Sequence, residues 1–317
     1  MKVLLVVNEA ASSVTARRQV IISKLIAADH DVTVAKTHRR DHATQLALGA
    51  ARTGTEVVMV LGGDGTLNEV ANGLVGTDCA VAALPGGSTN VFSRALGLSD
   101  DPIEAALTNL DAMAQRSIRS MGVGSVNGRY FTFHVGIGWD AALVEQVERR
   151  PEMKRWASHA LFIYAGLRTF FGTYDRRRPH FRVVHDDGRT VEDAYFAVVL
   201  NLNPYTFVGS RPFNLAPHAT LDNPLTAVAV RSMHALPFLG LLGSALNTGK
   251  RLQRARSVDF SPEVDHLVID ALVHGGAAVP VPYQVDGDYL GTVTRLELRH
   301  HPDALRLVVP RPIIARR

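Results

Sequence analysis

The chain has 317 residues, of which 46% are hydrophobic and 20% are charged, and this composition excludes wholesale disorder. Its length suits two domains or one elaborate α/β domain, and we expect two. The 34 Lys and Arg residues only slightly outnumber the 30 Asp and Glu, and no recognised nucleic-acid-binding motif is present, so we expect no nucleic-acid partner.

Apolar runs alternate with helix-like segments through the first hundred residues. Strands are predicted at 2–7, 31–36, 56–61 and 79–84, and helices at 16–29, 42–52, 66–74 and 88–96. Such alternation predicts a parallel sheet covered by helices on both faces. The opening apolar run is shorter than the roughly 7 to 15 residues of a signal peptide, so we expect a strand there.

The pattern changes near residue 118. Strand-like runs separated by Gly, Pro and Asn-Pro turns predict a mainly antiparallel β domain, with helices near 140–172 and 235–253. We therefore place one domain at 1–118 and a second at 119–317. The last strand-like runs, near 293–309, could belong to the second domain or return to the first, and the sequence does not decide between the two. The longest apolar stretch has twelve residues, and a membrane span needs about 20.

A glycine-rich bend follows the third predicted strand, in the sequence "VVMVLGGDGTLNEVANGL". Gly62, Gly63 and Gly65 lie at the carboxyl end of the strand, where open parallel sheets bind their ligands. Glycine permits positive φ and lets a ligand approach the backbone, whose N–H groups and the following helix N-terminus favour an anion. This bend predicts a cradle for nucleotide phosphates.

Asp64 stands within this bend, where a carboxylate repels phosphate unless a cation lies between them. Mg²⁺ reconciles the two, because it takes one or two carboxylates and keeps several waters. Thr66 and Glu69 have the spacing of a capping box, so the helix is predicted to begin at Thr66. The alternative interpretation is a plain tight turn between a strand and a helix.

A second glycine-rich turn, "LPGGSTNVFSRALG", follows the next strand. Gly86 and Gly87 provide the bend, and Gly97 is placed to cap the end of the short helix. Hydroxyl and amide groups at the helix start come from Ser88, Thr89 and Asn90. Two adjacent strand ends are thus predicted to face one ligand.

These segments resemble the diacylglycerol kinase catalytic-domain family, which includes bacterial lipid kinases and the sphingosine and ceramide kinases. Residues 62–74 and 84–98 are similar to its two nucleotide-binding signatures. Residues 135–144, 216–230 and 283–290 resemble three later motifs, the second in a degraded form. The resemblance extends over essentially the whole chain in the family's order.

The resemblance implies an ATP-binding α/β domain, like that of NAD kinases and phosphofructokinases, and a β-rich domain that binds the lipid. It implies a lipid hydroxyl as the acceptor in the cleft between them. The nucleotide-binding residues that we take from it are Asn8, Thr37, Gly62, Gly63, Asp64, Gly65, Thr66, Glu69, Gly86, Gly87, Ser88, Thr89 and Asn90.

The resemblance also implies the catalytic carboxylates. Asp64 and Asp140 would join a Mg²⁺ and water network, and Asp286 and Asp288 would approach the phosphoryl group, with Asp288 as general base. Asp288 is shorter by one methylene than the family's usual Glu. Two further positions depart from the family pattern where it has acids, namely Val91 and Thr226, the second in a structural metal site of some members.

Residues 149–182 contain nine basic and two acidic residues, interleaved with aromatic and aliphatic ones. This mixture predicts peripheral attachment to an anionic membrane surface, on its inner face. The alternative is a solvated helix whose apolar face packs on its own domain. The single cysteine, Cys79, lies in an apolar run and favours a reducing, cytoplasmic compartment. A homodimer is compatible with the sequence.

Two other functions remain open from the sequence. One is a soluble small-molecule kinase like NAD kinase, which shares "GGDGT". The other is a lipid or nucleotide sensor that kept the fold and lost the activity, which the Val91 and Thr226 changes motivate. His38 and His42 lack neighbouring acid or cysteine ligands, so we expect surface residues there and no metal site.

Overall fold

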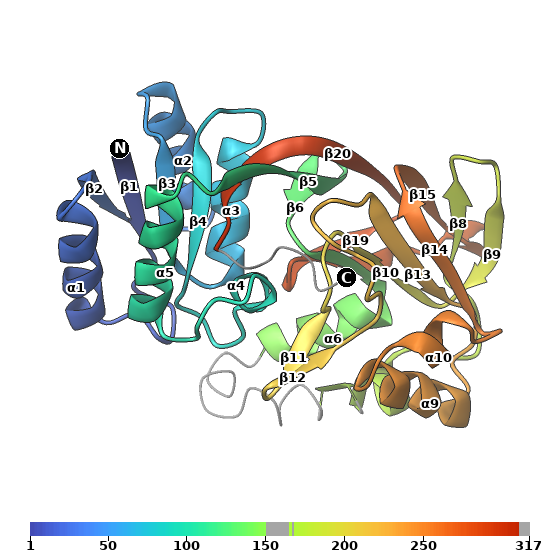
Figure 1. Cartoon of the computed structure of the whole chain (residues 1–317). Coiled ribbons are helices and arrows are strands. Elements are labelled where there is room, and N and C mark those ends of the chain that lie inside the picture. Colours follow the sequence, from blue (N-terminus) through green and yellow to red (C-terminus); the bar gives the residue numbers. More distant parts are fainter. Residues whose placement is uncertain (150–164, 167, 311–317) are drawn as a thin grey trace. The chain divides into compact units, whose positions relative to one another are not determined.

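Figure 1 shows the computed structural model, which describes residues 1–149, 165–166 and 168–310. The chain forms two compact units. Unit 1 is Met1–Val123 together with the residues from Pro302 onward, and unit 2 is Gly124–His301.

Unit 1 alternates strands and helices. Its elements are β1 (Lys2–Val7), α1 (Ala16–Ala27), β2 (Asp31–Lys36), α2 (His42–Arg52), β3 (Val57–Gly62), α3 (Asp64–Leu74), β4 (Ala80–Pro85), α4 (Val91–Ala95), α5 (Pro102–Ala114) and the first part of β5 (Ile118–Val126). Helix α5 and strand β5 were not predicted from the sequence.

The sheet of unit 1 is parallel in the order β2-β1-β3-β4. Helices α1 and α5 cover one face and α2 and α3 the other (Figure 1). Every residue of β3 and β4 is buried, which explains why these strands are unbroken apolar runs without alternation.

Unit 2 is built mainly from antiparallel strands. Its elements are β6 (Arg129–Phe131), β7 (His134–Gly138), α6 (Trp139–Glu148), the short π-helix η1 (Thr169–Thr173), β8 (Phe181–His185), β9 (Thr190–Ala194), β10 (Phe196–Leu200), β11 (Thr206–Val208), β12 (Arg211–Phe213), β13 (Leu225–Val230), α9 (Ala235–Ala245), α10 (Lys250–Gln253), β14 (Val258–Val264), β15 (His266–Ala271), β16 (Val273–His274), β17 (Ala277–Ala278), β18 (Val281–Val285), β19 (Asp288–Val293) and the first part of β20 (Arg295–Val308).

Unit 2 has two hydrophobic cores, one on each face of a central sheet. One six-stranded sheet has the order β14-β13-β10-β7-β18-β19. One of its faces packs against strands that include β8, β9 and β15, around side chains such as Phe131, Phe181 and Leu298. Its other face packs against α6, η1, α9 and α10 around Trp139, Phe170 and Phe238. The sheet is therefore buried on both faces.

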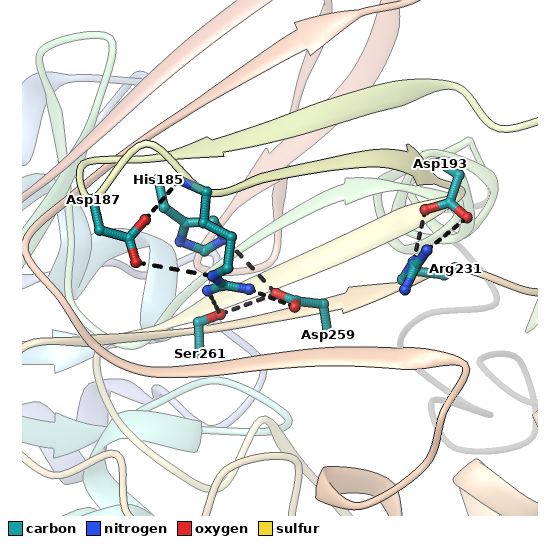
Figure 2. A network of polar contacts seen from close by, with 7 residues as sticks. His185, Asp187, Asp193, Arg231, Asp259 and Ser261 are labelled. Atoms are coloured by element: carbon teal, nitrogen blue, oxygen red, sulfur yellow. Dashed lines mark hydrogen bonds and ion pairs between the residues drawn. The ribbon is translucent and has the colours of Figure 1, made fainter.

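A polar network joins the β8–β9 hairpin to β14 at the edge of the first layer. Arg189 donates to Asp259 Oδ1 at 2.5 Å and to Ser261 Oγ at 2.6 Å. Ser261 Oγ in turn donates to Asp259 Oδ2, and Figure 2 shows these two side chains together. The buried ring of His185 lies 3.7 Å from Asp259 Oδ2. The contact with the His185 ring, followed by the hydrogen bond from Ser261 and the Arg189 charge, holds the pKa of Asp259 below its usual value.

Strand β20 supplies residues to both units. Arg306 and Leu307 pair in parallel with Ala80 and Val81 of β4. The residues 295–299 pair antiparallel with β15. The predicted fold class is confirmed, because an α/β part with a parallel sheet is followed by a mainly antiparallel β part. Among the helices of the described residues, none is both long and apolar enough to cross a membrane.

Candidate functional site

The candidate nucleotide residues gather at one edge of the unit 1 sheet. Asn8 and Thr37 directly follow β1 and β2, and the two glycine turns follow β3 and β4, so all lie at the carboxyl ends of parallel strands. The Asn8 amide donates to Thr66 Oγ1 at 2.9 Å, which ties the end of β1 to helix α3. The structure thus brings the ends of four strands to one edge.

The two glycine turns pack backbone against backbone. Gly86 N donates to Gly62 O at 2.8 Å, and a Cβ on Gly86 would lie 2.9 Å from Gly62 Cα. A Cβ on Gly87 would lie 2.9 Å from Gly63 Cα. The sequence analysis gave positive φ as one reason for glycine in these turns. Gly62, Gly63, Gly86 and Gly87 do not have positive φ in the structure. Close approach of the two loops requires glycine here.

Asn90 closes the second turn on itself. It lies in the left-handed region with φ 48°, and its Oδ1 accepts from Gly87 N at 2.8 Å. Its Nδ2 donates back to Gly87 O at 2.9 Å. Between the two ends of this ring Ser88 is exposed and Thr89 is half-buried. The loop is therefore held rigidly by its own amide side chain.

Asp64 links the two glycine turns. Its Oδ2 accepts from Val91 N at 2.9 Å and its Oδ1 from Phe92 N at 3.1 Å, so the carboxylate caps the start of α4. Val91, which stands at a position where the resemblance implies an acid, has a buried side chain and contributes its backbone N–H here.

The predicted start of the α3 helix was wrong. The helix begins at Asp64 with Gly63 as N-cap, two residues before Thr66. The capping box is not formed either, because Glu69 Oε2 accepts from Ala43 N at 3.1 Å, in the first turn of α2. Glu69 therefore fixes the neighbouring helix.

Asp286 of unit 2 is a buried anchor. Its Oδ2 accepts from the Thr132 N–H and hydroxyl at 2.7 and 2.8 Å, and its Oδ1 from Phe133 N and His134 N at 3.0 Å each. Burial raises the pKa of Asp286, and the four donors oppose that shift. These bonds fall at residues 132–134, between β6 and the start of β7.

Asp286 also shapes the turn between β18 and β19. Asp286 and Gly287 have φ values of 47° and 84°, and Val285 pairs with Asp288 across the hairpin. A two-residue turn with both central φ positive is the type I′ turn that Asp-Gly favours. The "DGD" motif is thus a tight hairpin with its two acids in different environments.

Asp140 lies at the start of α6, fully buried. Tyr205 donates its hydroxyl to Oδ1, and Gln284 Nε2 donates to Oδ2 at 2.8 Å. A Cβ on Gly136 would fall 1.5 Å from Oδ2, so glycine at that position makes room for the carboxylate. Burial raises the pKa of Asp140, and the hydrogen bonds from Tyr205 and Gln284 act against the rise.

Asp140 and the β18–β19 turn belong to one hydrogen-bond chain. Gln284 uses its Nε2 for Asp140 and its Oε1 to accept from Gly287 N at 2.8 Å. The buried His134 ring lies 4.5 Å from the Tyr205 ring between centroids. Burial lowers the pKa of His134 to about 3, so the imidazole is neutral at pH 7.

Sequence reasoning missed Tyr205, Gln284 and His134. Gln284 lies in the motif at residues 283–290 that the sequence analysis identified. A polar side chain within an otherwise apolar strand indicates a buried hydrogen-bond partner. Tyr205 and His134 gave no comparable signal, because their roles depend on which strands pair.

Asp288 differs from the other two candidate acids of unit 2, Asp140 and Asp286. It is half-buried at the first position of β19, and its carboxylate has no hydrogen-bond or ion-pair partner among the described residues. Asp288 therefore keeps all its acceptor positions available, whereas Asp140 and Asp286 use theirs on the protein.

Other candidates have simpler surroundings. Thr226 is buried within β13, and the exposed His38 ring stacks on the half-buried His42 ring with centroids 5.6 Å apart. In the described part of the chain, no three His, Cys, Asp or Glu side chains cluster as a metal site. Much of the basic cluster at 149–182 lies outside the described residues, namely 150–164 and 167.

Known proteins resemble this chain. Residues 2–126 match the family model described as "Diacylglycerol kinase catalytic domain". The "Diacylglycerol kinase" of Bacillus subtilis is 36% identical over 121 residues, which are 37% of this chain and 39% of that protein. The "Putative lipid kinase YtlR" of the same organism is 27% identical over 274 residues, 79% of each chain.

A solved structure has the same fold. It is titled "Crystal structure of a putative diacylglycerol kinase from Bacillus anthracis str. Sterne", superposes with a TM-score of 0.75 at 22% identity, and covers 99% of this chain and 98% of that one. The family match spans both glycine turns and Asp64. Residues 2–126, less than half of the 317-residue chain, are thus similar to the diacylglycerol kinase catalytic domain.

Proposed function

We propose that the protein is a lipid kinase that transfers the γ-phosphate of ATP to a hydroxyl of diacylglycerol or a related lipid, with Mg²⁺. The observation that carries this proposal is the pair of interlocked glycine turns at the carboxyl edge of the unit 1 sheet, within the region that matches the family. A soluble NAD-kinase-like activity is the competing function.

Unit 1 is proposed to hold the nucleotide phosphates. Its glycine turns expose backbone without side chains, and the eleven-residue helix α3 begins at the same place. A helix N-terminus and glycine-rich backbone favour an anion at this position.

Asp64 fits the proposed metal. The Asp64 carboxylate lies at the start of α3 and holds the start of α4 through Val91 N and Phe92 N, so it stands beside both glycine turns. Mg²⁺ takes one or two carboxylates and keeps several waters, so a carboxylate at this place suits a metal bound together with the phosphates. When bound, Mg²⁺ supplies charge neutralisation of the phosphates. The residues present are compatible with this role.

Unit 2 is proposed to activate the lipid hydroxyl. Of the three candidate acids there, Asp288 is the one whose carboxylate has no partner among the described residues, so we assign it the acceptance of the hydroxyl proton. Asp286 shapes the turn that carries Asp288, and Asp140 braces the same turn through Gln284. Asp140 and Asp286 are then positioning residues, and a direct contact with the phosphoryl group is better suited to Asp288.

The working location proposed is the inner face of a membrane, with the protein attached peripherally. The described part of 149–182 supports this in one respect, because the Arg176 guanidinium lies 4.4 Å from the Phe170 ring and 5.3 Å from the Phe171 ring. A cation and aromatic rings placed together suit the headgroup region of a bilayer.

Transfer of label from γ-labelled ATP tests the activity. The acceptors are diacylglycerol, ceramide and sphingosine in separate vesicle preparations, with Mg²⁺, and NAD as the soluble acceptor. Label in one lipid product is the expected result, and it identifies the acceptor. Label in NAD alone would replace the lipid kinase by the soluble kinase. ATP binding without transfer to any acceptor would favour the sensor.

A further inference from the structure

Helix α9 exposes an apolar face. Its sequence, "ALPFLGLLGSA", is apolar on nearly every side. Phe238, Leu241 and Ala245 are buried in the core of unit 2, yet Leu236 is 83% exposed and Leu239 is 51% exposed. A helix that is apolar all round normally lies in a core or in lipid.

The exposed leucines share one side of the helix. Positions 236, 239, 243 and 246 follow helical spacing, and Leu246 at the helix end is 44% exposed. Gly240 and Gly243 between them are also exposed and leave the leucine side chains uncovered. Contiguous exposed apolar side chains on one element mark an interaction site.

Basic side chains border this apolar face. Leu252 N of α10 donates to Ser244 Oγ of α9 at 3.0 Å, so the two helices lie together (Figure 1). The cations on and after α10 are Lys250, Arg251, Arg254 and Arg256, all exposed, with no ion-pair partner among the described residues. No Asp or Glu occurs anywhere between Asp222 and Asp259.

The aromatic residues of η1 lie beside α9. The Phe170 ring stacks on the Phe238 ring with centroids 4.6 Å apart, which places η1 beside α9. Phe171 next to it is 61% exposed, and Arg176 lies over both phenylalanine rings. Exposed Leu and Phe with bordering cations and no acid in the segment complement an anionic, apolar surface.

We infer that the α9–α10 surface, defined by Leu236, Leu239, Leu246, Lys250, Arg251 and Arg254, docks on an anionic lipid bilayer. The leucines enter the boundary between headgroups and acyl chains, and the cations meet the lipid phosphates. The inference does not depend on the proposed kinase activity, since docking needs neither ATP nor a lipid acceptor. It assigns membrane contact to α9 and α10, beyond the 149–182 segment.

A fluorescent label on the helix tests the docking directly. Leu239→Cys can be labelled selectively with an environment-sensitive nitrobenzoxadiazole, because the native Cys79 is buried and burial raises its pKa to about 11. The probe is a vesicle of phosphatidylcholine and phosphatidylglycerol, without ATP or diacylglycerol. The expected result is a blue shift with rising intensity. Leu107→Cys on α5, also 51% exposed, is the matched control and should not respond.

Vesicle sedimentation separates the apolar and charged contributions. Leu236→Gln with Leu239→Gln should lower partitioning at least about tenfold at any salt concentration. Lys250→Gln with Arg251→Gln should lower it roughly fivefold per charge in low salt, and the difference should vanish near about 1 M salt. Arg17→Gln with Lys24→Gln on α1 removes two exposed cations from unit 1 as the control.

Three outcomes would overturn the inference. A protein that sediments with vesicles while the label at position 239 stays silent binds through another surface. A clear fall in Tm for Leu236→Gln with Leu239→Gln would mean that the chain itself covers these leucines. A change from dimer to monomer in the same variant, measured by light scattering, would assign the surface to a second copy of the chain.

Discussion

The glycine turns of unit 1 and the carboxylates of unit 2 represent two ways of building a site. In unit 1, loops approach each other because side chains are missing, as at Gly63 and Gly87. In unit 2, strands and turns are fixed by buried side chains, and the carboxylates of Asp140 and Asp286 accept hydrogen bonds from donors of the protein itself. A residue in a family motif can therefore serve the scaffold more than the reaction.

Asp288→Ala is the sharpest test of this contrast. Loss of a general base should lower kcat by roughly 10² to 10⁴, while Tm should hardly change because the carboxylate has no protein partner among the described residues. Steady-state kinetics and thermal unfolding on one preparation measure both. Unchanged turnover would remove Asp288 from the mechanism.

Asp286→Ala should show the opposite balance. Four donors lose their acceptor in a buried site, so the free energy of unfolding should fall by at least about 3 kcal/mol. Urea unfolding measures the loss. A stable variant with abolished turnover would return Asp286 to direct chemistry and would break the distinction between the two acids of the turn.

Gly87→Ala tests the other side of the comparison. The added methyl meets Gly63 Cα at 2.9 Å and must push the two turns apart, which should lower kcat/KM by about 10² through misplacement of the phosphates. Gly49→Ala in α2 is the control, because its Cβ meets nothing within 4 Å and φ is not positive. Equal activity of both variants would show that the close approach is dispensable.

Tyr205→Phe examines the brace behind the β18–β19 turn. Removing one donor from the buried Asp140 carboxylate should lower the free energy of unfolding by about 1 to 3 kcal/mol. Tyr283→Phe is the control, since the Tyr283 hydroxyl has no hydrogen bond among the described residues. Equal urea midpoints for the two variants would contradict the assigned role of Tyr205.

Asp259→Asn gives the smallest effect, through pH. The pKa of Asp259 is lowered in the folded protein, so its contribution to stability is present above the usual value of 3.8 and is lost as the pH falls through the folded pKa. The Tm difference between wild type and variant should therefore be seen at pH 6 and shrink below pH 3.8. A difference independent of pH would mean that the Arg189 and Ser261 contacts do not depend on the charge.

Periodicity predicted the parallel sheet of unit 1 because its strands are short, apolar and buried on both faces, as β3 and β4 are. The position of the glycine turns followed from the same pattern. Their physical reason did not, since the contact between Gly62 and Gly86 is made by residues far apart in sequence. The start of α3 was misplaced because Glu69 caps a neighbouring helix, which local spacing cannot reveal.

The acids of unit 2 show a similar limit. Their sequence positions were found through the resemblance, but nothing in "DGD" tells which aspartate is saturated with donors. That depends on the Thr132 to His134 segment, about 150 residues earlier in the chain. The buried network of Tyr205 and Gln284 around Asp140 depends on strand pairing in the same way.

Strand β20 has a consequence for how the chain is made. Strands β1 to β4 are synthesised early, and β3 then lies beside β4. The second neighbour of β4 is β20, whose Arg306 and Leu307 are synthesised only after all of unit 2. Val309 then bonds to Ser117, which left the ribosome almost two hundred residues before. Until then this edge of β4 lacks its native partner strand. The sheet of unit 1 can therefore be completed only after unit 2 has been synthesised.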